Sequence, residues 1–209
     1  MTLSTEQIER YSRQVILPEV GGRGQERLLA ATVCVGGGGP AATTTALLLG
    51  RAGVGTLVVP DGFGPLPELS PDCAVRRYAG VEPVTADVDV GLSEPGGGVP
   101  FALDSAARPL VLGLVRDARL VVATLVGRPC RRCWLQALRP EELETGAPGD
   151  PTPAAALPVA LGALAASEAL RVLLAPPPAG RLTSLDLEHG AAAARDLTSG
   201  GCSCCGVPS

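Results

Sequence analysis

Four of the seven cysteines form two CxxC pairs, Cys130/Cys133 and Cys202/Cys205. Each CxxC turn supplies two thiolates close enough to bind one metal ion, and two such pairs complete the tetrahedral set of four ligands that structural zinc requires. The spacing therefore predicts a structural Zn²⁺ that ties the end of the chain back to its middle. A catalytic zinc is not expected, because four protein ligands leave no open position for water.

Two alternatives to this ligand set remain open. Cys204 could replace Cys205 as the fourth ligand, and the thiols could instead form two disulfides or remain unrelated to one another. Residues 1–6 are polar and lack the apolar stretch of a secretory signal, which predicts a cytoplasmic protein. Zinc is favoured over disulfides, because disulfides rarely persist in a reducing cytosol.

A second chemical signal is a glycine-rich turn. Thr32–Val35 is a β-branched run typical of a buried strand, and it leads directly into GGGGPA over residues 36–41. Backbone N–H groups of such a turn, at the positive end of a helix, form a cradle for phosphate. Pro40 removes one of these N–H groups, so the alternative is a tight turn that binds nothing.

An acidic residue follows the turn at a meaningful distance. Gly36, Gly38 and Ala41 occupy the fixed positions of the G-x-G-x-x-G/A pattern, and Asp61 ends the next predicted strand, 20 residues after Ala41. A carboxylate at that place can accept hydrogen bonds from ribose hydroxyl groups. Strand, turn, helix and acid together predict a nucleotide site without naming its reaction.

Several motifs carry a resemblance to a known family. They are ERYSRQVILP over residues 9–18, GQERL over residues 24–28, the glycine turn, and AGVG over residues 52–55. Together with the type and order of the cysteine pairs, they resemble the ThiF/MoeB/HesA family, the prokaryotic relatives of ubiquitin-activating enzymes. The resemblance is close over residues 8–61 and again over residues 109–136.

The resemblance implies an ATP-dependent reaction on a protein or peptide. Members of the family bind MgATP and adenylate the C-terminal glycine carboxylate of a small ubiquitin-like protein, such as a sulfur carrier, with release of pyrophosphate. Many are homodimers in which each ATP site takes an arginine from the partner. The expected cofactors are therefore Zn²⁺, ATP and Mg²⁺, and the expected partners are a second copy and a ubiquitin-like carrier protein or peptide.

Several residues match the family's site. Gly36, Gly38 and Gly39 match the phosphate-binding loop, and Asp61 matches the acid that binds the ribose. Arg13 matches the arginine that reaches across the dimer. These residues form the nucleotide part of the predicted site.

Other parts of the family's site have no clear match. The chain contains no lysine, so the lysine that meets the ATP phosphates has no counterpart. Leu69-Ser70 could begin the family's L-S-N-L-Q-R-Q motif, whose arginine survives only if Arg76 or Arg77 is shifted into place. The Asp-Asn pair that holds magnesium is missing, and Asp89 is a poor substitute. Adenylation depends on stabilising phosphate charge, so reduced or altered activity is expected.

Three functions remain open at this point. The favoured one is a ThiF/MoeB-like adenylyltransferase with altered or reduced activity. The second is a degenerate, non-catalytic zinc-binding member that serves as a scaffold or partner protein. The third is a dinucleotide-dependent oxidoreductase, against which the zinc pairs and the helix before the glycine turn argue.

These residues require an α/β fold to position them. We expect a Rossmann-like, mostly parallel sheet flanked by helices in a single domain over residues 1–209. Within it we expect N-terminal helices over residues 4–30, a nucleotide-binding core over 32–126, and a zinc segment, long helix and C-terminal strands over 127–209.

The periodicity predicts individual elements. The first helix has Ser4 as its N-cap residue and Gln7 at the capping-box position. The predicted helices are Ser4–Leu17, Gly24–Ala30, Ala42–Ala52 and a long helix that ends at Ala175. The predicted strands are Thr32–Val35, Thr56–Pro60, Val81–Val90, Pro109–Val115, Arg119–Val126, Arg181–Leu187 and Ala191–Leu197.

Composition excludes some classes of function. The net charge of −4 gives no basic surface for nucleic acid. The apolar stretch over residues 153–175 contains Pro158, Glu168 and Arg171, which predicts a buried or dimer-facing helix and no membrane span. The single histidine, His189, is expected to be exposed at a strand end.

Overall fold

The computed structural model describes residues 2–66, 68–79, 85–93, 108–116, 118–127, 133–134, 156–177 and 179–197. The elements in chain order are α1 (Thr5–Arg10), α2 (Ser12–Val15), α3 (Gly21–Ala30), β1 (Thr32–Gly36), α4 (Gly39–Arg51), β2 (Thr56–Pro60), β3 (Ala74–Tyr78), β4 (Val88–Ser93), β5 (Leu110–Arg116), β6 (Arg119–Leu125), α7 (Leu157–Leu174), β7 (Gly180–Asp186) and β8 (Ala191–Leu197).

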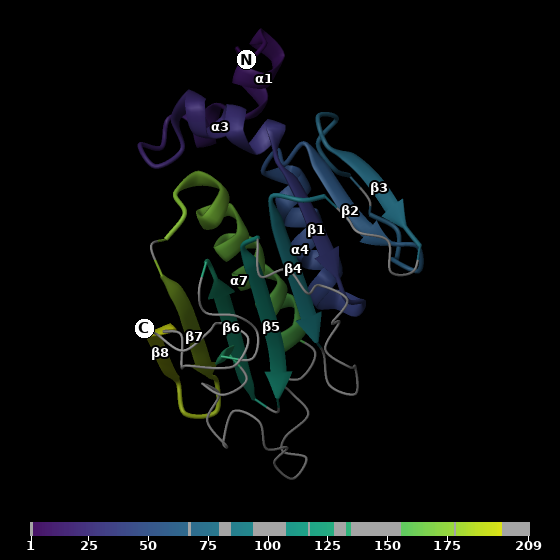
Figure 1. Cartoon of the computed structure of the whole chain (residues 1–209). Coiled ribbons are helices and arrows are strands. Elements are labelled where there is room, and N and C mark those ends of the chain that lie inside the picture. Colours follow the sequence, from purple (N-terminus) through teal and green to yellow (C-terminus); the bar gives the residue numbers. More distant parts are fainter. Residues whose placement is uncertain are drawn as a thin grey trace.

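One sheet, with its strands in the order β3-β2-β1-β4-β5-β6-β7-β8, forms the centre of the molecule (Figure 1). The strands from β3 to β5 are parallel to one another, and those from β5 to β8 are antiparallel. Strands β1 and β2 are parallel neighbours joined through α4, which confirms the predicted succession of strand, glycine turn, helix and strand. The predicted Rossmann-like α/β fold, with its mostly parallel sheet, is likewise confirmed.

Helices α4 and α7 cover one face of the sheet, where they pack side by side (Figure 1). Their apolar residues form the main core with alternate residues of the strands, such as Val35, Val59 and Val111. The intervening residues of β5 and β6 pack on the opposite face around Trp134, in a cluster that also contains Leu197. Strands β1 and β2 are mostly apolar along their whole length because both of their faces are buried.

Helix α7 is long and apolar enough, by length and composition alone, to cross a membrane. Its position in the core explains this composition and confirms the predicted buried helix. Its two charged residues form an internal network with the sheet. Thr124 of β6 donates to Glu168 Oε2 over 2.5 Å, and Arg171 pairs with the same oxygen atom.

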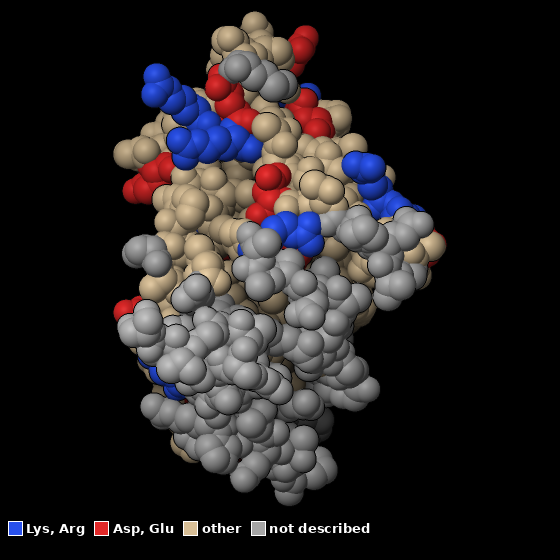
Figure 2. Space-filling model, viewed as in Figure 1, with Lys and Arg blue, Asp and Glu red and all other residues tan. Residues whose placement is uncertain are grey.

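Helices α1 to α3 lie over the amino ends of the parallel strands (Figure 1). On the face drawn in Figure 2, a group of basic side chains lies beside acidic ones over these helices. The predicted capping box is confirmed, since Ser4 Oγ accepts from the Gln7 amide and the Gln7 side chain accepts from the Ser4 amide. The first predicted helix is divided at Tyr11, because this side chain turns into the body of the protein while Ile8 stays exposed.

Two strands differ from the prediction. Strand β3 was not predicted, because it lies at the sheet edge, where Ala74 to Arg77 are exposed on both faces and show no apolar alternation. Strand β4 begins at Val88, later than the predicted strand over 81–90, of which residues 81–84 lie outside the described chain. Asp87 exchanges hydrogen bonds with the backbone of Thr32 through its own amide and its carboxylate, and the strand pairing with β1 starts at the next residue.

Candidate functional site

The candidate site lies at the carboxyl ends of β1, β2 and β4. Strand β1 pairs with β2 on one side and with β4 on the other. Strands β2 and β3 are added on one side of β1, and the strands from β4 onward are added on its other side, so the strand order reverses between β1 and β4. Such a reversal is where ligands bind in open α/β sheets. The glycine turn at residues 36–39 leaves β1 at this point and opens α4.

Two glycines of the turn, Gly37 and Gly39, have backbone conformations that favour glycine. Gly37 has a φ of 107°, and a Cβ atom there would lie 2.5 Å from the carbonyl oxygen of Leu92 in β4. Gly39 also has a positive φ, 74°, at the first position of α4. Gly38 is extended, exposed and has no heavy atom within 4 Å of a Cβ position. The backbone of the turn therefore packs closely against β4 at Gly37, and it is open to solvent at Gly38.

The amino end of α4 is fixed from behind by α7. A Cβ atom at Gly162 would lie 2.4 Å from the carbonyl oxygen of Ala41, so the two helices approach closely only because this residue is glycine. Thr45 Oγ1 bridges them, with both the Ala41 and the Gly162 carbonyl oxygen at 3.0 Å. Gly38, the N-cap residue, has no side chain to occupy the helix end, which suits binding of an anion there.

Asp61 follows β2 at the same edge of the sheet. Continuing the observed register places it level with Gly37, one strand spacing of about 5 Å away across the sheet. Its amide donates to the Tyr78 carbonyl oxygen over 3.1 Å, and Phe63 closes the turn by donating to the Pro60 carbonyl oxygen over 2.9 Å. The Asp61 side chain is exposed. The structure thus brings the predicted ribose acid and the glycine turn to one edge.

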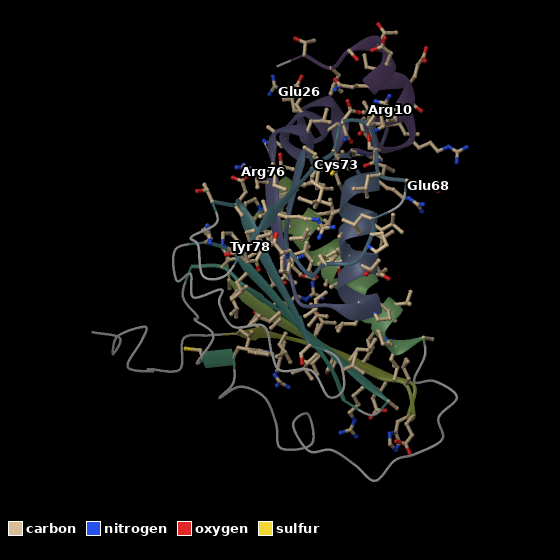
Figure 3. The ribbon with its side chains drawn as sticks, turned by 90° about the vertical axis from the view of Figure 1, so that its right-hand side faces the viewer. Arg10, Glu26, Glu68, Cys73, Arg76 and Tyr78 are labelled. Atoms are coloured by element: carbon tan, nitrogen blue, oxygen red, sulfur yellow. The ribbon has the colours of Figure 1, made fainter. Side chains whose placement is uncertain are left out.

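The two arginines of β3 face different sides of the sheet. Arg77 Nη1 donates to the carbonyl oxygens of Asp61, at 2.9 Å, and Phe63, at 2.8 Å, and it lies 3.4 Å from that of Pro60. Arg76 is exposed on the side away from α4 (Figure 3). No contact described for either arginine joins it to the glycine turn.

Asp89 lies four residues before the carboxyl end of β4 and is bound in an ion pair. It is the second residue of β4, level with Cys34, and it is buried. Its Oδ2 accepts from Arg108 Nη2 at 2.9 Å. Cys34 is buried as predicted, and burial, followed by the Asp89 charge, raises the pKa of its thiol to about 11, which makes it inert.

Arg13 lies at the opposite end of the sheet from the glycine turn. It is an exposed residue of α2, beside the amino ends of the parallel strands. The five residues of β1 alone span about 16 Å between these two ends. Within one chain, Arg13 and the glycine turn are therefore not brought together.

A hydrogen-bond network that sequence reasoning missed holds the helix before Arg13. The Tyr11 hydroxyl lies 2.6 Å from Ser70 Oγ and donates to Asp72 over 3.0 Å, while Gln7 and Arg10 bind the same carboxylate. Burial opposes ionisation of Asp72, but these donors outweigh it, so the pKa of Asp72 lies below its usual value. No periodic signal in the sequence marks this pairing, because 59 or more residues separate the partners.

Only Cys133 of the four predicted zinc ligands falls within the described residues. Cys130, Cys202 and Cys205 lie outside them. Cys133 is buried, directly beside the fully buried Trp134. Over the described ranges, no group of three or more His, Cys, Asp or Glu side chains is placed to hold a metal ion.

The only histidine has a local structural role. His189 is exposed in the turn between β7 and β8, as predicted, and its Nδ1 lies 3.1 Å from Asp186 Oδ2. Asp186 also binds Arg119 of β6, so the contact belongs to the hairpin end, in the antiparallel half of the sheet.

Comparison with known proteins gives the chain's relatives. No protein-family model matches it. It is similar to Adenylyltransferase and sulfurtransferase MOCS3 of Bos taurus, with 32% identity over 230 residues that cover 90% of this chain and 50% of the bovine protein. It is 31% identical over 218 residues to SAMP-activating enzyme E1 of Haloferax volcanii, covering 83% of this chain and 79% of that enzyme. The chain thus spans about half the length of the MOCS3 proteins.

Solved structures agree in fold. The crystal structure of E. coli MccB with succinimide superposes with a TM-score of 0.68 over 94% of this chain and 74% of MccB, at 16% sequence identity. At this identity the similarity establishes the arrangement of helices and strands and nothing about activity.

Proposed function

The chain belongs to the ThiF/MoeB/HesA family, and from this membership we propose that it activates the C-terminal carboxylate of a small ubiquitin-like sulfur-carrier protein, or of a peptide, by ATP-dependent adenylation. We further propose that this activity is reduced or altered. The names of the relatives support the reaction type, since one is an adenylyltransferase and another activates SAMP. The observation that carries the proposal is the glycine turn beside Asp61 at the carboxyl edge of the sheet.

In the proposed reaction, a carboxylate oxygen of the substrate attacks the α-phosphorus of ATP. The bond from that phosphorus to the β-phosphate oxygen breaks, pyrophosphate leaves, and an acyl-adenylate remains. The backbone N–H groups at the start of α4 bind the phosphates, with the helix end supplying positive potential. The Asp61 carboxylate accepts hydrogen bonds from the ribose hydroxyl groups.

Missing positive charge is the reason to expect reduced activity. The chain has no lysine. The Arg77 guanidinium is occupied by backbone carbonyl oxygens, and Asp89, bound to Arg108, does not fit the role of a magnesium ligand. Loss of one group that stabilises transition-state charge commonly costs about 10²–10³ in rate. Arg76 is the remaining candidate of β3 for a phosphate contact.

These absences also favour the second candidate function. A family member that keeps the fold and binds nucleotide without stabilising the transition state would serve as a scaffold or as a partner for an active homologue. Uniform binding of this kind lowers a dissociation constant without raising turnover.

The proposed assembly is a homodimer in which Arg13 of one subunit serves the ATP site of the other. The support is geometric, because Arg13 and the glycine turn of one chain lie at opposite ends of the sheet. The exposed apolar residues Ile16 and Leu17 beside α2 add a surface that a second copy could cover.

The proposed zinc site uses Cys130, Cys133, Cys202 and Cys205. Support comes from Trp134 and Leu197, which belong to one buried cluster. Cys133 adjoins Trp134, and Cys202 follows Leu197 by five residues, a span of at most about 18 Å. The chain segments that lead to the two cysteine pairs therefore leave the same buried cluster. Zinc-bound thiolates, unlike disulfides, are expected to persist in a reducing cytoplasm.

ATP–pyrophosphate exchange tests the proposed activity. We expect slow exchange that depends on a carrier protein ending in Gly-Gly or on a peptide substrate, at least about 10²-fold below an active homologue measured alongside. ATP binding without any exchange would favour the scaffold function. Exchange as fast as the homologue's would contradict the reduced activity and direct mutagenesis to Arg76.

Complementation between two variants tests the shared site. At an ATP concentration below the wild-type Kd, Arg13→Ala and Asp61→Ala should each lower exchange about tenfold or more as homodimers. Mixed subunits should regain up to about a quarter of wild-type exchange, because each heterodimer contains one intact site in a two-fold dimer. No recovery on mixing, although subunit exchange is demonstrated by mass spectrometry, would contradict the action of Arg13 in the partner's site.

A further inference from the structure

Arg77 fixes the backbone of the turn that carries Asp61. Its Nη1 binds the carbonyl oxygen of Asp61 at 2.9 Å and that of Phe63 at 2.8 Å. The Asp61 amide donates to the Tyr78 carbonyl oxygen of the same strand, so β3 holds both the N–H and the C=O of this residue. Phe63 is buried in the main core and anchors the far side of the turn.

The arrangement leaves the Asp61 carboxylate available. Arg77 binds the main-chain oxygen of Asp61, and no ion pair described in the structure involves the Asp61 side chain. That side chain is exposed at the edge of the sheet. With its backbone held at both ends of the residue, only side-chain rotation remains to be restricted when a ligand binds.

The same contacts separate Arg77 from the phosphates. Strand β2 lies between β3 and β1, so Arg77 starts about 10 Å from the strand that leads into the glycine turn. Its Nη1 is directed at the turn after β2, where three carbonyl oxygens converge on it. A guanidinium is suited to this task, because its planar donors stay charged and make directional bonds to oxygen.

We propose that Arg77 is a positioning residue for ribose recognition, which acts by holding the turn from which the Asp61 carboxylate binds the ribose hydroxyl groups. This role rests on the proposed nucleotide site. A positioning role affects binding of the ribose, whereas a phosphate contact would affect binding of the phosphates.

Titration calorimetry with two nucleotides separates these roles. Wild-type protein should bind ATP about tenfold more tightly than 2′,3′-dideoxy-ATP, since the latter lacks the hydroxyl groups that Asp61 binds. Arg77→Ala should weaken ATP binding about tenfold, change dideoxy-ATP binding less than twofold, and so abolish the preference. Asp61→Ala should give the same pattern, and the double variant should add little to either single change.

Arg51→Ala is the matched control. Arg51 also binds the connection between β2 and β3. Its guanidinium donates to the main-chain oxygen and to a side-chain oxygen of Glu68, away from the turn at Asp61. Its loss should leave the preference for ATP unchanged. Arg77→Lys, which keeps a charge but not the planar donors, should retain part of the preference, and it replaces Arg77→Ala if that variant does not fold.

Other outcomes would overturn the proposal in distinguishable ways. Equal weakening of both nucleotides by Arg77→Ala would assign Arg77 to the phosphates or to the fold as a whole. Unchanged ATP binding in that variant would show that the turn at Asp61 keeps its conformation without Arg77. If the wild type binds ATP and dideoxy-ATP equally, Asp61 does not bind the ribose. If the wild type binds neither, the proposed nucleotide site fails, and the role of Arg77 fails with it.

Discussion

Replacing Gly37 by alanine is expected to destabilise the protein by about 3 kcal/mol and to abolish measurable ATP binding. The new Cβ atom would lie 2.5 Å from the Leu92 carbonyl oxygen, and the φ of 107° is one that L-residues rarely adopt. The turn must then leave β4, which moves the amino end of α4. For a chain of this size, thermal unfolding should show a loss of about 6–12 °C in Tm.

Gly38→Ala is the control for this effect. Gly38 is extended and has open space around it, so alanine should change the unfolding free energy by no more than about 0.5 kcal/mol. Its methyl group would instead stand at the helix end where phosphate is proposed to bind, and should weaken ATP binding about tenfold or more. If Gly38→Ala leaves ATP affinity at the wild-type value, phosphate does not bind at this turn.

Removing the proposed zinc should have the other large effect. Cys133→Ser is expected to reduce the metal content from one Zn²⁺ per chain to none and to lower Tm by more than about 10 °C, because structural zinc binding contributes directly to folding. A strong chelator should act on the wild type in the same way. X-ray absorption should show four sulfur atoms at about 2.3 Å from the metal.

Cys73→Ser is the matched control, since Cys73 is half-buried near α4 and belongs to neither pair. It should keep its zinc. Comparing Cys204→Ser with Cys205→Ser identifies the fourth ligand, because only one of them should lose the metal. The zinc hypothesis would be wrong if wild-type protein purified without chelator contained no zinc. If a thiol reductant also lowered its Tm, the cysteines would form disulfides instead.

The sequence predicted the elements whose patterns are strong and local. The β-branched run before four glycines, and the apolar run before Asp61, identified β1, α4 and β2 within a few residues. It did not reveal β3, whose exposed Ala-Val-Arg-Arg segment has no alternation. Edge strands are defined by the neighbour they pair with, and that information is not local.

The site was predicted unevenly for the same reason. Gly38 and Asp61 stand at fixed offsets in a motif, and the structure brings their segments to one edge of the sheet. Arg77 was considered only as a possible phosphate ligand. Its bonds to carbonyl oxygens depend on how β3 pairs with β2, and a side chain that binds backbone leaves no residue-type signal at its partner. The contacts of Tyr11 with Ser70 and Asp72 escaped prediction in the same way.

The packing of α7 against α4 has a consequence for the order in which the protein acquires structure. Helix α4 lies in the first quarter of the chain, whereas its covering helix begins at Leu157, more than 100 residues later. A ribosome adding about 5–20 residues per second needs several seconds or more to cross that interval. Until then the side of α4 at Ala41 and Thr45 lacks the helix that packs on it in the fold. We therefore expect the nascent chain to be open to chaperone binding during that interval.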